Sequence, residues 1–195
     1  MLYELAHTIQ AKVPWIWEGI EMLNAAFCGL KIGDKKFLEE CLPDHVKIAD
    51  VNDASRLADF FVRQPEESYR WFRPHAFDEA TMRTLLGRKS YIIYVQEEDG
   101  EIIGYAFLRC FINGKAFLGK MVDVQHRGKG VCTTLCKVGM DLATKTGFRM
   151  LESINKANIG SMKASQKACD VLILEELEDG DVLIEDFPKG SLKEL

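Results

Sequence analysis

The stretch from Leu118 to Cys132 contains the residues whose types and spacing best suit a chemical role. Gly128 and Gly130 lie on either side of a lysine, between an apolar β-prone segment and an apolar helical stripe. A strand, a glycine turn and a helix in this order leave the first N–H groups of the helix free and direct its positive dipole end at the turn. Such a turn can hold a phosphate. The alternative is an ordinary strand-to-helix turn that needs glycine for its backbone angles.

The spacing of the glycines distinguishes between phosphate ligands. The chain lacks both the Gly-x-x-x-x-Gly-Lys-Ser/Thr loop of nucleoside triphosphate sites and the Gly-x-Gly-x-x-Gly turn of dinucleotide sites. It has Gln125-x-x-Gly128-x-Gly130 instead, preceded by Gly119 and Val122. This pattern closely resembles the Gln/Arg-x-x-Gly-x-Gly/Ala signature of the GCN5-related N-acetyltransferase (GNAT) superfamily. In that superfamily the signature cradles the pyrophosphate of acetyl-CoA.

A second segment, 155–165, is similar to the same superfamily. There an Asn opens the helix after the fifth strand, lies at or near the pantetheine arm, and is followed three residues later by Ala or Ser. Asn158 and Ser161 match this pattern, although Asn158 is also a good ordinary N-cap. The resemblance implies acetyl-CoA as co-substrate, with coenzyme A as product. The cofactor-binding residues that it implies are Val122, Asp123, Val124, Gln125, His126, Arg127, Gly128, Lys129, Gly130, Val131, Cys132, Asn158 and Ser161.

The chemistry that the resemblance implies is direct transfer of acetyl from acetyl-CoA to a primary amine. The thioester carbonyl needs an N–H donor as negative charge builds on its oxygen, and the splayed fourth strand of the family places a backbone donor near Val122. Many members protonate the departing thiolate with a Tyr, at whose position this chain has Ser165. Either another group serves, or the thiolate leaves as the anion or takes a proton from water, because thiols titrate at about 8.5.

Several side chains are candidates for the base that takes the proton from the amine. In the superfamily the loop between the first two helices shapes the acceptor pocket, so Glu67, Tyr69 and His75 qualify. The unperturbed pKa of a histidine, about 6.5, suits this role. A lone histidine after proline is, however, also typical of a surface or capping residue. Arg70 and Arg73 suit an acidic group on the acceptor, or simply a solvated face.

Hydrophobic periodicity and turn residues predict the elements that must position these residues. The predicted strands span 46–50, 91–95, 102–108, 116–124, 148–152, 171–174 and 182–184, with Asp99-Gly100 as a hairpin turn. The predicted helices lie between 54 and 65, after Asp78, at 130–145 and at 158–168. This order is similar to that of the GNAT fold over roughly 45–187. It implies an α+β domain in which helices flank a mixed, mostly antiparallel central sheet.

Residues 1–44 form a predicted N-terminal helical extension, which precedes an acetyltransferase domain at 45–195. Pro14 suits the first turn of a helix, and Trp15 and Trp17 add bulk near its start. The apolar residues of this helix, Ile16, Ile20, Leu23, Phe27 and Leu30, repeat at intervals of four and three. This stripe predicts a helix that packs on the domain's own sheet or helices. The alternative is an element that forms a dimer or covers the substrate, because such a stripe must be buried somewhere.

Composition limits the classes of partner. The net charge of −5 argues against nucleic acid or an anionic membrane as the main partner. The six cysteines include no Cys-x-x-Cys pair, and no metal-site spacing involves them or the four histidines. They predict buried thiols in a reducing compartment. No signal peptide pattern and no membrane-spanning run are evident, which predicts a cytoplasmic protein.

These observations predict an acetyl-CoA-dependent N-acetyltransferase. Its expected acceptor is the primary amine of a small molecule, such as an amino sugar, an amino acid or a polyamine. One alternative is a protein or peptide N-acetyltransferase, which would need an open groove beside the acceptor loop. The other is a non-catalytic acyl-CoA-binding module, which the Ser165 substitution and the N-terminal helix favour.

Overall fold

The computed structural model describes residues 14–40 and 42–194 of the chain. Its helices are α2 (Pro14–Ile32), α3 (Lys35–Glu39), α4 (Ala54–Val62), α5 (Glu79–Leu86), α6 (Val131–Thr146) and α7 (Ile159–Ala168). Its strands are β1 (Val46–Ile48), β2 (Tyr91–Glu98), β3 (Glu101–Cys110), β4 (Lys115–Val122), β5 (Arg149–Asn155), β6 (Asp170–Glu176) and β7 (Asp181–Phe187). Short 3₁₀ turns are η1 (Val51–Asp53), η2 (Glu66–Tyr69), η3 (Val124–His126) and η4 (Ser191–Glu194). The predicted order of elements from β1 to β7 is confirmed.

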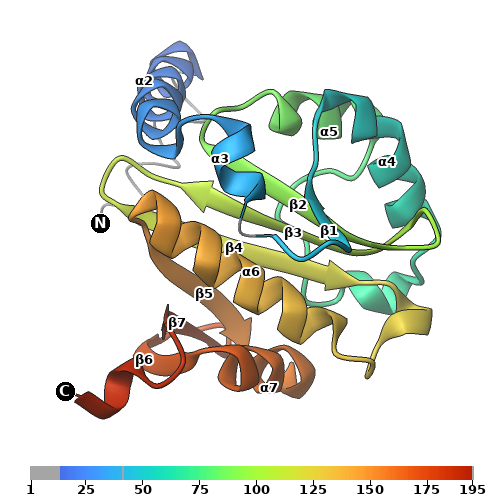
Figure 1. The fold of residues 1–195 in the computed structure, drawn as a ribbon, viewed down its shortest axis with the longest axis vertical. Helices are drawn as coiled ribbons and strands as arrows, with labels where there is room; N and C mark the ends of the chain where they lie inside the picture. The colour runs from blue at the N-terminus through green and yellow to red at the C-terminus, as the bar shows by residue number, and fades with distance from the viewer. Residues whose placement is uncertain (1–13, 41, 195) are drawn as a thin grey trace.

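The seven strands form one sheet in the order β1-β2-β3-β4-β5-β7-β6 (Figure 1). All neighbours are antiparallel except β4 and β5, which run parallel. Asp99 and Gly100 have positive φ angles of 51° and 83°, as a tight hairpin turn between β2 and β3 requires. The predicted α+β class, with its mixed and mostly antiparallel sheet, is confirmed.

The strands β4 and β5 are joined only near their first residues. Residues 115–117 pair with residues 149–151, and no later pair joins these two strands in the part of the chain that the structure describes. On its other side β4 stays paired with β3 as far as Val122. Figure 1 shows β4 and β5 diverging beyond their common start. A gap therefore opens in the middle of the sheet.

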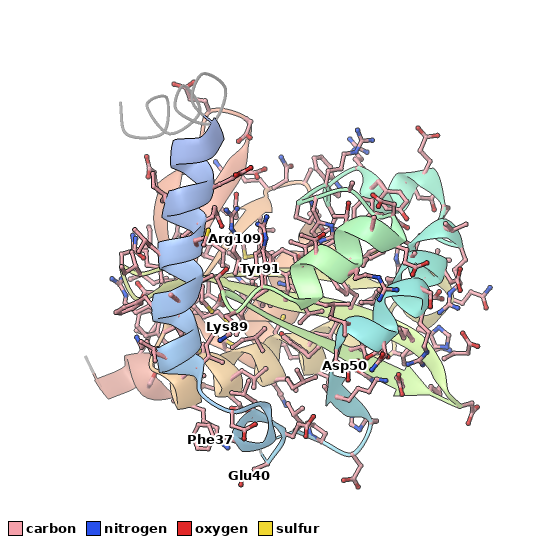
Figure 2. All side chains as sticks on the ribbon, turned by 90° about the horizontal axis from the view of Figure 1, so that it is seen from above. Phe37, Glu40, Asp50, Lys89, Tyr91 and Arg109 are labelled. Carbon is pink, nitrogen blue, oxygen red and sulfur yellow. The ribbon has the colours of Figure 1, made fainter. Side chains whose placement is uncertain are left out.

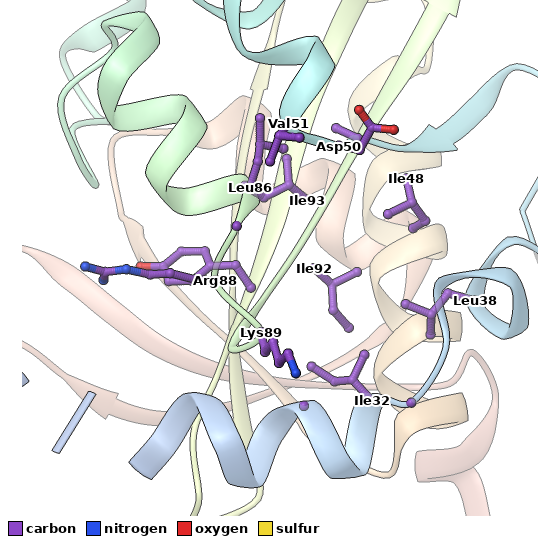
Figure 3. Close-up of a pocket in the computed structure, with 15 residues that line it drawn as sticks. Ile32, Leu38, Ile48, Asp50, Val51, Leu86, Arg88, Lys89, Ile92 and Ile93 are labelled. Carbon is purple, nitrogen blue, oxygen red and sulfur yellow. The ribbon is translucent and has the colours of Figure 1, made fainter. Parts of the chain in front are cut away.

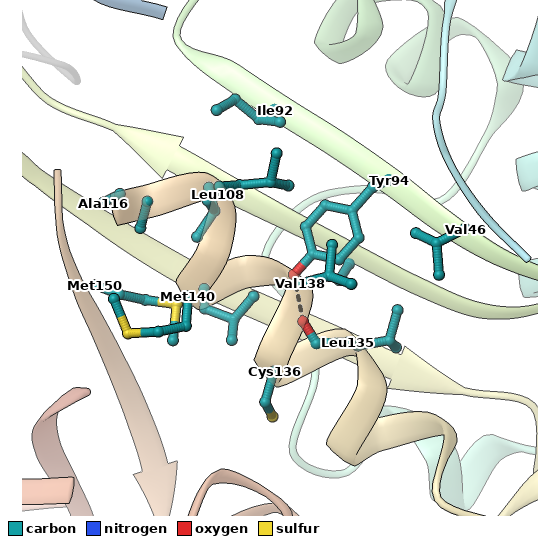
Figure 4. Packing of buried hydrophobic residues seen from close by; sticks show 14 of the residues in the cluster. Val46, Ile92, Tyr94, Leu108, Ala116, Leu135, Cys136, Val138, Met140 and Met150 are labelled. Atoms are coloured by element: carbon teal, nitrogen blue, oxygen red, sulfur yellow. Dashed lines mark hydrogen bonds between the residues drawn. The ribbon is translucent and has the colours of Figure 1, made fainter. Parts of the chain in front are cut away.

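Helices cover both faces of the sheet, because successive side chains of each strand point to opposite faces. On one face, α6 packs over a core that includes Tyr94, Leu108 and Ala116 (Figure 4). On the other face, α4 and α5 pack over a core that includes Tyr105 and Phe107. The gap between β4 and β5 consequently lies between two well-packed layers.

The Tyr94 hydroxyl joins the sheet to α6 by donating a hydrogen bond of 2.7 Å to the carbonyl oxygen of Leu135 (Figure 4). Replacing Tyr94 by phenylalanine is expected to lower the free energy of unfolding by about 1 kcal/mol, because the ring packing stays and the buried hydrogen bond is lost. In a chain of this size the Tm should fall by about 2–4 °C. Tyr91→Phe is the control, since no described residue bonds to the Tyr91 hydroxyl. Unchanged stability of Tyr94→Phe would contradict the prediction.

The apolar stripe of α2 does not face the domain, so that part of the N-terminal prediction is wrong. Leu23 and Leu30 are 71% and 87% exposed, and Ile20 and Phe27 are exposed as well. The side chains of residues 15–17, including the predicted contributions of Ile16 and the two tryptophans, lie outside the described part of the chain, as do residues 1–13. The spacing of apolar residues in the sequence identified an apolar face of α2, but it could not show whether this face contacts the rest of the domain.

α2 instead contacts the sheet through another face, on which the polar residue Asn24 is buried together with Cys28 and Ile32 of the hydrophobic core. The buried Asn24 side chain donates to the Cys110 carbonyl at 3.0 Å and accepts from the Ile112 N–H at 2.8 Å. Figure 2 shows Arg109 beside this helix, and its guanidinium lies 3.0 Å from the Glu21 carboxylate. Specific hydrogen bonds to backbone groups thus fix α2 on the β3–β4 end of the sheet. The division into domains at residue 44 stays a prediction.

Candidate active site

The gap between β4 and β5 opens into a cleft of about 730 Å³. Residues 118–122 of β4 and 152–155 of β5 border it along the gap. The glycine loop, the first turn of α6 and the start of α7 form further walls, and part of the segment 67–72 borders it as well. The cleft therefore brings together segments that the sequence predicts to hold a cofactor and to shape an acceptor pocket.

Backbone donors of β4 point into the gap. The Asp123 N–H donates to the Ile103 carbonyl at 2.9 Å, and the Lys115 carbonyl accepts from Phe111 at 2.8 Å, both on the β3 side. Because alternate residues of a strand face opposite neighbours, the backbone N–H groups of even-numbered residues face β5. The N–H groups at positions 118, 120 and 122 therefore border the gap, and the role of the donor near Val122 stays a prediction.

Two glycines and an aspartate shape the loop after β4. Gly128 has a φ of 75°, and Gly130, the N-cap of α6, has a φ of 92°; side chains disfavour this left-handed region. The Asp123 carboxylate accepts from the Gln125 N–H at 2.9 Å. Burial alone would raise the pKa of Asp123, but hydrogen bonds from Gln64, His126 and Gln125 lower it. The charged Asp123 carboxylate thus stabilises the start of the loop through this hydrogen bond.

The first turn of α6 offers free donors to the cleft. The first helical hydrogen bond of α6 runs from the Thr134 N–H to the Gly130 carbonyl, at 3.0 Å. Within the described part of the chain, no acceptor binds the backbone N–H groups of Val131, Cys132 and Thr133. Free N–H groups and the positive end of a helix dipole attract anions. The loop therefore fits a phosphate or pyrophosphate group.

The structure places the predicted cofactor residues in two groups. Those that line the cleft are Val122, His126, Arg127, Gly128, Gly130, Cys132, Asn158 and Ser161. Those that do not line it are Asp123, Val124, Gln125, Lys129 and Val131. Asn158 is also the N-cap of α7, because its side chain accepts from the Ser161 N–H at 3.2 Å. The role of these residues in cofactor binding stays a prediction.

The three candidate bases have different surroundings. The Nδ1 atom of His75 lies 2.7 Å from the Ala76 carbonyl and its Nε2 atom 3.1 Å from the Tyr105 hydroxyl, outside the cleft. Burial lowers the pKa of His75, so its ring is neutral at pH 7. Tyr69, also outside the cleft, donates its hydroxyl to the Phe61 carbonyl. Glu67 is the one candidate of the three that lines the cleft.

A buried charged cluster borders the cleft where β4 and β5 separate. Lys120 of β4 forms an ion pair with Glu152 of β5, and their side chains are only 4% and 2% exposed. Ser165 of α7 lies between them: its Oγ is 3.1 Å from Lys120 Nζ and donates to Glu152 Oε1 at 2.8 Å. The sequence patterns above do not single out this pair. The available signal was a lysine and a glutamate within otherwise apolar strand segments.

Lys120 is charged, and its charge affects the pKa of a neighbouring thiol. Burial alone would lower the pKa of Lys120, but the Glu152 carboxylate raises it above its ordinary value, so the ammonium stays charged. Cys132 lines the cleft beside this cluster. A hydrogen bond with Cys136, followed by the Lys120 charge, lowers the pKa of the Cys132 thiol in spite of its burial. The Lys120 charge is thus one of the causes that lower the pKa of Cys132, and the Glu152 charge opposes it.

Asp186 of β7 provides a pH-dependent contribution to stability. Burial and then the Glu152 charge raise the pKa of Asp186 to about 8. The native state then holds a proton that the unfolded chain releases above its ordinary pKa of about 3.9, so this group lowers the free energy of unfolding as pH rises from about 4 to 8. Asp186→Asn should remove this loss. Urea unfolding of both proteins from pH 5 to 9 measures it, and parallel curves would contradict the prediction.

A second cavity, of about 330 Å³, lies between α2, α3, β1 and β2 (Figure 3). Ile32, Leu38 and Ile92 contribute its apolar wall, and Lys89 and Asp50 lie at its border (Figure 3). It shares no lining residue with the cleft, and none of the predicted site residues borders it. The predicted chemistry therefore belongs to the cleft.

Comparison with protein families agrees with this geometry. A model described as the acetyltransferase (GNAT) family matches residues 56–170, which is more than half of the chain. The chain belongs to the GNAT family. The match spans the segment from α4 to the start of β6 and includes the whole glycine loop. The predicted resemblance is thus confirmed, and membership of GNAT supports an acyltransferase. A search of curated proteins gave no match.

Solved structures share the GNAT fold at low sequence identity. The GNAT domain of S. lividans PAT is 21% identical with a TM-score of 0.64, over 73% of this chain and 89% of that domain. Ribosomal-protein-S5-alanine acetyltransferase from Vibrio fischeri is 16% identical with a TM-score of 0.64, over 76% and 95% of the two chains. Aminoglycoside acetyltransferase AAC(6')-Ib in complex with coenzyme A and kanamycin is 15% identical with a TM-score of 0.58, over 76% and 96%.

These relatives show the fold of this GNAT protein and do not identify its acceptor. Within residues 14–40 and 42–194, no helix is long and apolar enough to cross a membrane.

Proposed function

We propose that this GNAT protein transfers acetyl from acetyl-CoA to a primary amine of a small molecule, such as an amino sugar, an amino acid or a polyamine. The main support for this proposal is that the cleft is continuous. One space of about 730 Å³ reaches from the free N–H groups of α6, through the gap between β4 and β5, to Glu67 and Trp71. An extended donor with a phosphate end and a reactive end requires such a path.

Each part of the path supplies one contribution. The loop with Gly128 and Gly130 and the first turn of α6 would hold the pyrophosphate of acetyl-CoA. The β4 N–H groups that face the gap, including that of Val122, would bind the thioester carbonyl as negative charge builds on its oxygen. The bound cofactor supplies an activated acetyl group. Asn158 and Ser161, which line the cleft, would hold its pantetheine arm.

Glu67 is the base that we favour for the acceptor amine. It lines the cleft, whereas both ring nitrogens of His75 lie against groups outside it. A carboxylate also attracts the ammonium form in which free amines arrive, and it can pass the proton to water. Arg70 stacks on Trp71, with its guanidinium carbon 4.5 Å from the ring centroid, on the same side of the cleft. This side combines an acidic, a basic and an aromatic group and thus suits a polar amine.

A protein or peptide acceptor is the second candidate. One solved relative is named for alanine acetylation of a ribosomal protein and another for aminoglycosides, so the family fold accommodates both classes. A non-catalytic acyl-CoA-binding module is the third. The small-molecule acceptor is favoured because the side of the cleft at 67–72 begins with a compact turn, η2, to which Arg127 donates a 2.6 Å hydrogen bond at Ser68.

Two further features support proposals about assembly and location. The exposed residues Ile20, Leu23, Phe27 and Leu30 repeat at the spacing of a helix–helix seam, so a second copy of this chain is the proposed partner of α2. The described cysteines are unpaired and mostly buried, which supports a reducing, cytoplasmic location; Cys41 lies outside the described residues. Size measurement with and without residues 1–44 tests the dimer, and a monomer in both cases contradicts it.

Acetyl-CoA should raise the Tm of the protein, because a ligand that binds only the native state stabilises it. At about 100 times the dissociation constant, the stabilisation is about 2.7 kcal/mol. Thiol release is then measured over a panel of amino sugars, amino acids, polyamines and peptides. No stabilisation by acetyl-CoA would overturn the proposed function. Stabilisation without thiol release from any acceptor would favour the non-catalytic module.

A further inference from the structure

We propose that the Lys120 ammonium is a catalytic group that stabilises the sulfur anion released from the acyl donor. This inference rests on the proposed function, because it requires a thioester in the cleft. It concerns a cluster of side chains, Lys120, Glu152 and Ser165, that is buried at the point where β4 and β5 separate. Three properties of the cluster carry it: its position, an unused hydrogen-bond donor, and the burial of its charge.

The position of Lys120 is set by the backbone. β4 and β5 stop pairing after residues 117 and 151, so Lys120 and Glu152 are among the first residues beyond the separation. Both line the cleft. Since even-numbered backbone N–H groups of β4 face the gap, Lys120 presents its main chain to the same space. A thioester that accepts a hydrogen bond from the backbone of Lys120 would lie close to the side chain of the same residue.

The ammonium has one donor to spare. A lysine ammonium carries three N–H groups, and its described acceptors are the Glu152 carboxylate and the Ser165 hydroxyl. Ser165 in turn donates to Glu152 at 2.8 Å, so it is the acceptor in its contact with lysine. No described residue accepts the third N–H. A buried donor without an acceptor is costly, and the cleft is the space from which an anionic acceptor can reach it.

The burial of this charge distinguishes it from the other cations of the cleft. Arg70, Arg127, Lys163 and Lys167 also line the cleft but are exposed to solvent. Water screens exposed charges strongly, whereas a buried cation acts through a low dielectric. Fixed charges aimed at developing charge are the largest single contribution in many enzymes. Among the described cations that border the cleft, Lys120 is the one placed to act in this way.

The reaction step balances without a proton from Lys120. The amine nitrogen forms a bond to the acetyl carbon, the carbon–sulfur bond breaks, and sulfur keeps the electron pair. The proton of the amine passes to Glu67 or water, and the sulfur anion takes a proton from solvent after release. Lys120 keeps its own proton because Glu152 lies beside it. The remaining groups that face the ammonium are Ser165 on α7, Cys132 and Cys136 on α6, and Asp186 on β7 beyond Glu152.

The test measures the ionisation of the thiol of bound coenzyme A by the ultraviolet absorbance of thiolate. The complex with desulfo-coenzyme A is the reference, so that absorbance from Cys132 and Cys136 cancels. In the unmodified protein the bound thiol should titrate at least about one pH unit below the thiol of free coenzyme A measured under the same conditions. In Lys120→Met/Glu152→Met, which removes both charges together, this shift should disappear. Lys137→Met, an exposed lysine of α6 outside the cleft, should keep the full shift.

Kinetics provide a second readout. The double variant should lose about 100-fold in kcat, with little change in the KM for acetyl-CoA, because the contact strengthens only as sulfur becomes negative. Lys120→Gln/Glu152→Gln gives a second neutral pair if the methionine pair fails to fold. An equal thiol pKa in the unmodified protein and a folded neutral-pair variant would overturn the inference. Absence of coenzyme A binding to the unmodified protein would instead overturn the proposed function.

Discussion

Replacing Gly130 by valine is expected to weaken acetyl-CoA binding by about 100-fold or more. Gly130 has a φ of 92°, a left-handed conformation that costs a side-chain-bearing residue about 1–2 kcal/mol and a β-branched one more. The loop must relax, and the free N–H groups of Val131 and Cys132 would then turn away from the phosphate site. About 2.8 kcal/mol of lost binding free energy corresponds to this change in affinity. Isothermal titration with acetyl-CoA measures it.

The chain offers a matched control for this substitution. Gly190 has a φ of 91° and open space around its α-carbon, as Gly130 has, but it does not border the cleft. Gly190→Val should therefore impose a similar backbone strain and leave acetyl-CoA affinity unchanged. If Gly130→Val binds acetyl-CoA as tightly as Gly190→Val does, the phosphate site lies elsewhere.

The single substitution Lys120→Met is expected to destabilise the protein by about 3–5 kcal/mol. It leaves the Glu152 carboxylate, only 2% exposed, without its cation, and an unpaired buried charge is strongly unfavourable. For a chain of this length the Tm should fall by about 6–20 °C. Thermal unfolding of the variant and the unmodified protein measures this loss.

The double variant Lys120→Met/Glu152→Met separates the unpaired charge from lost packing. Replacing both members of a buried ion pair by apolar residues of similar volume is often close to neutral. The double variant should therefore be much more stable than Lys120→Met alone. If the single and the double variant were equally unstable, packing at these positions would explain the loss and charge pairing would not.

Most of the fold could be predicted from the sequence because its elements carry local signals. The β-prone segments on either side of the Asp99-Gly100 turn, such as 91–95, identify a hairpin from local sequence alone. The Asp78 N-cap, whose side chain accepts from the Thr81 N–H at 2.9 Å, likewise marks the start of α5. Such signals depend on neighbours in the sequence, and so they survive in the structure.

The contacts of α2 could not be predicted in the same way. Its apolar residues predict a helix, but the docking face is chosen by Asn24, which reaches Cys110 more than eighty residues away. Periodicity predicts which residues share one face of a helix. It does not predict which surface of the domain that face will contact. The predicted apolar stripe that includes Ile20 and Leu23 therefore exists, but the prediction that it packs on the domain is wrong.

The candidate site shows the same limit. The glycine loop was predictable because its anion-binding groups are consecutive in the sequence. The Lys120–Glu152 pair was not, because its two members lie 32 residues apart in the sequence, on strands that meet only in the folded sheet. His75 illustrates the converse: a suitable residue type in a suitable loop lies with its ring nitrogens against Ala76 and Tyr105.

The separation of β4 from β5 has a consequence for dynamics. It divides the sheet into a four-stranded and a three-stranded plate, which three residue pairs join as a hinge. Backbone amides at Leu118 and Val122 should therefore exchange with solvent hydrogen as those of an edge strand do, although β4 is the central strand of seven. A ligand that spans the two plates should slow this exchange and restrict the hinge at once. Unpaired backbone groups of this sheet are thus expected at its centre as well as along its two edge strands.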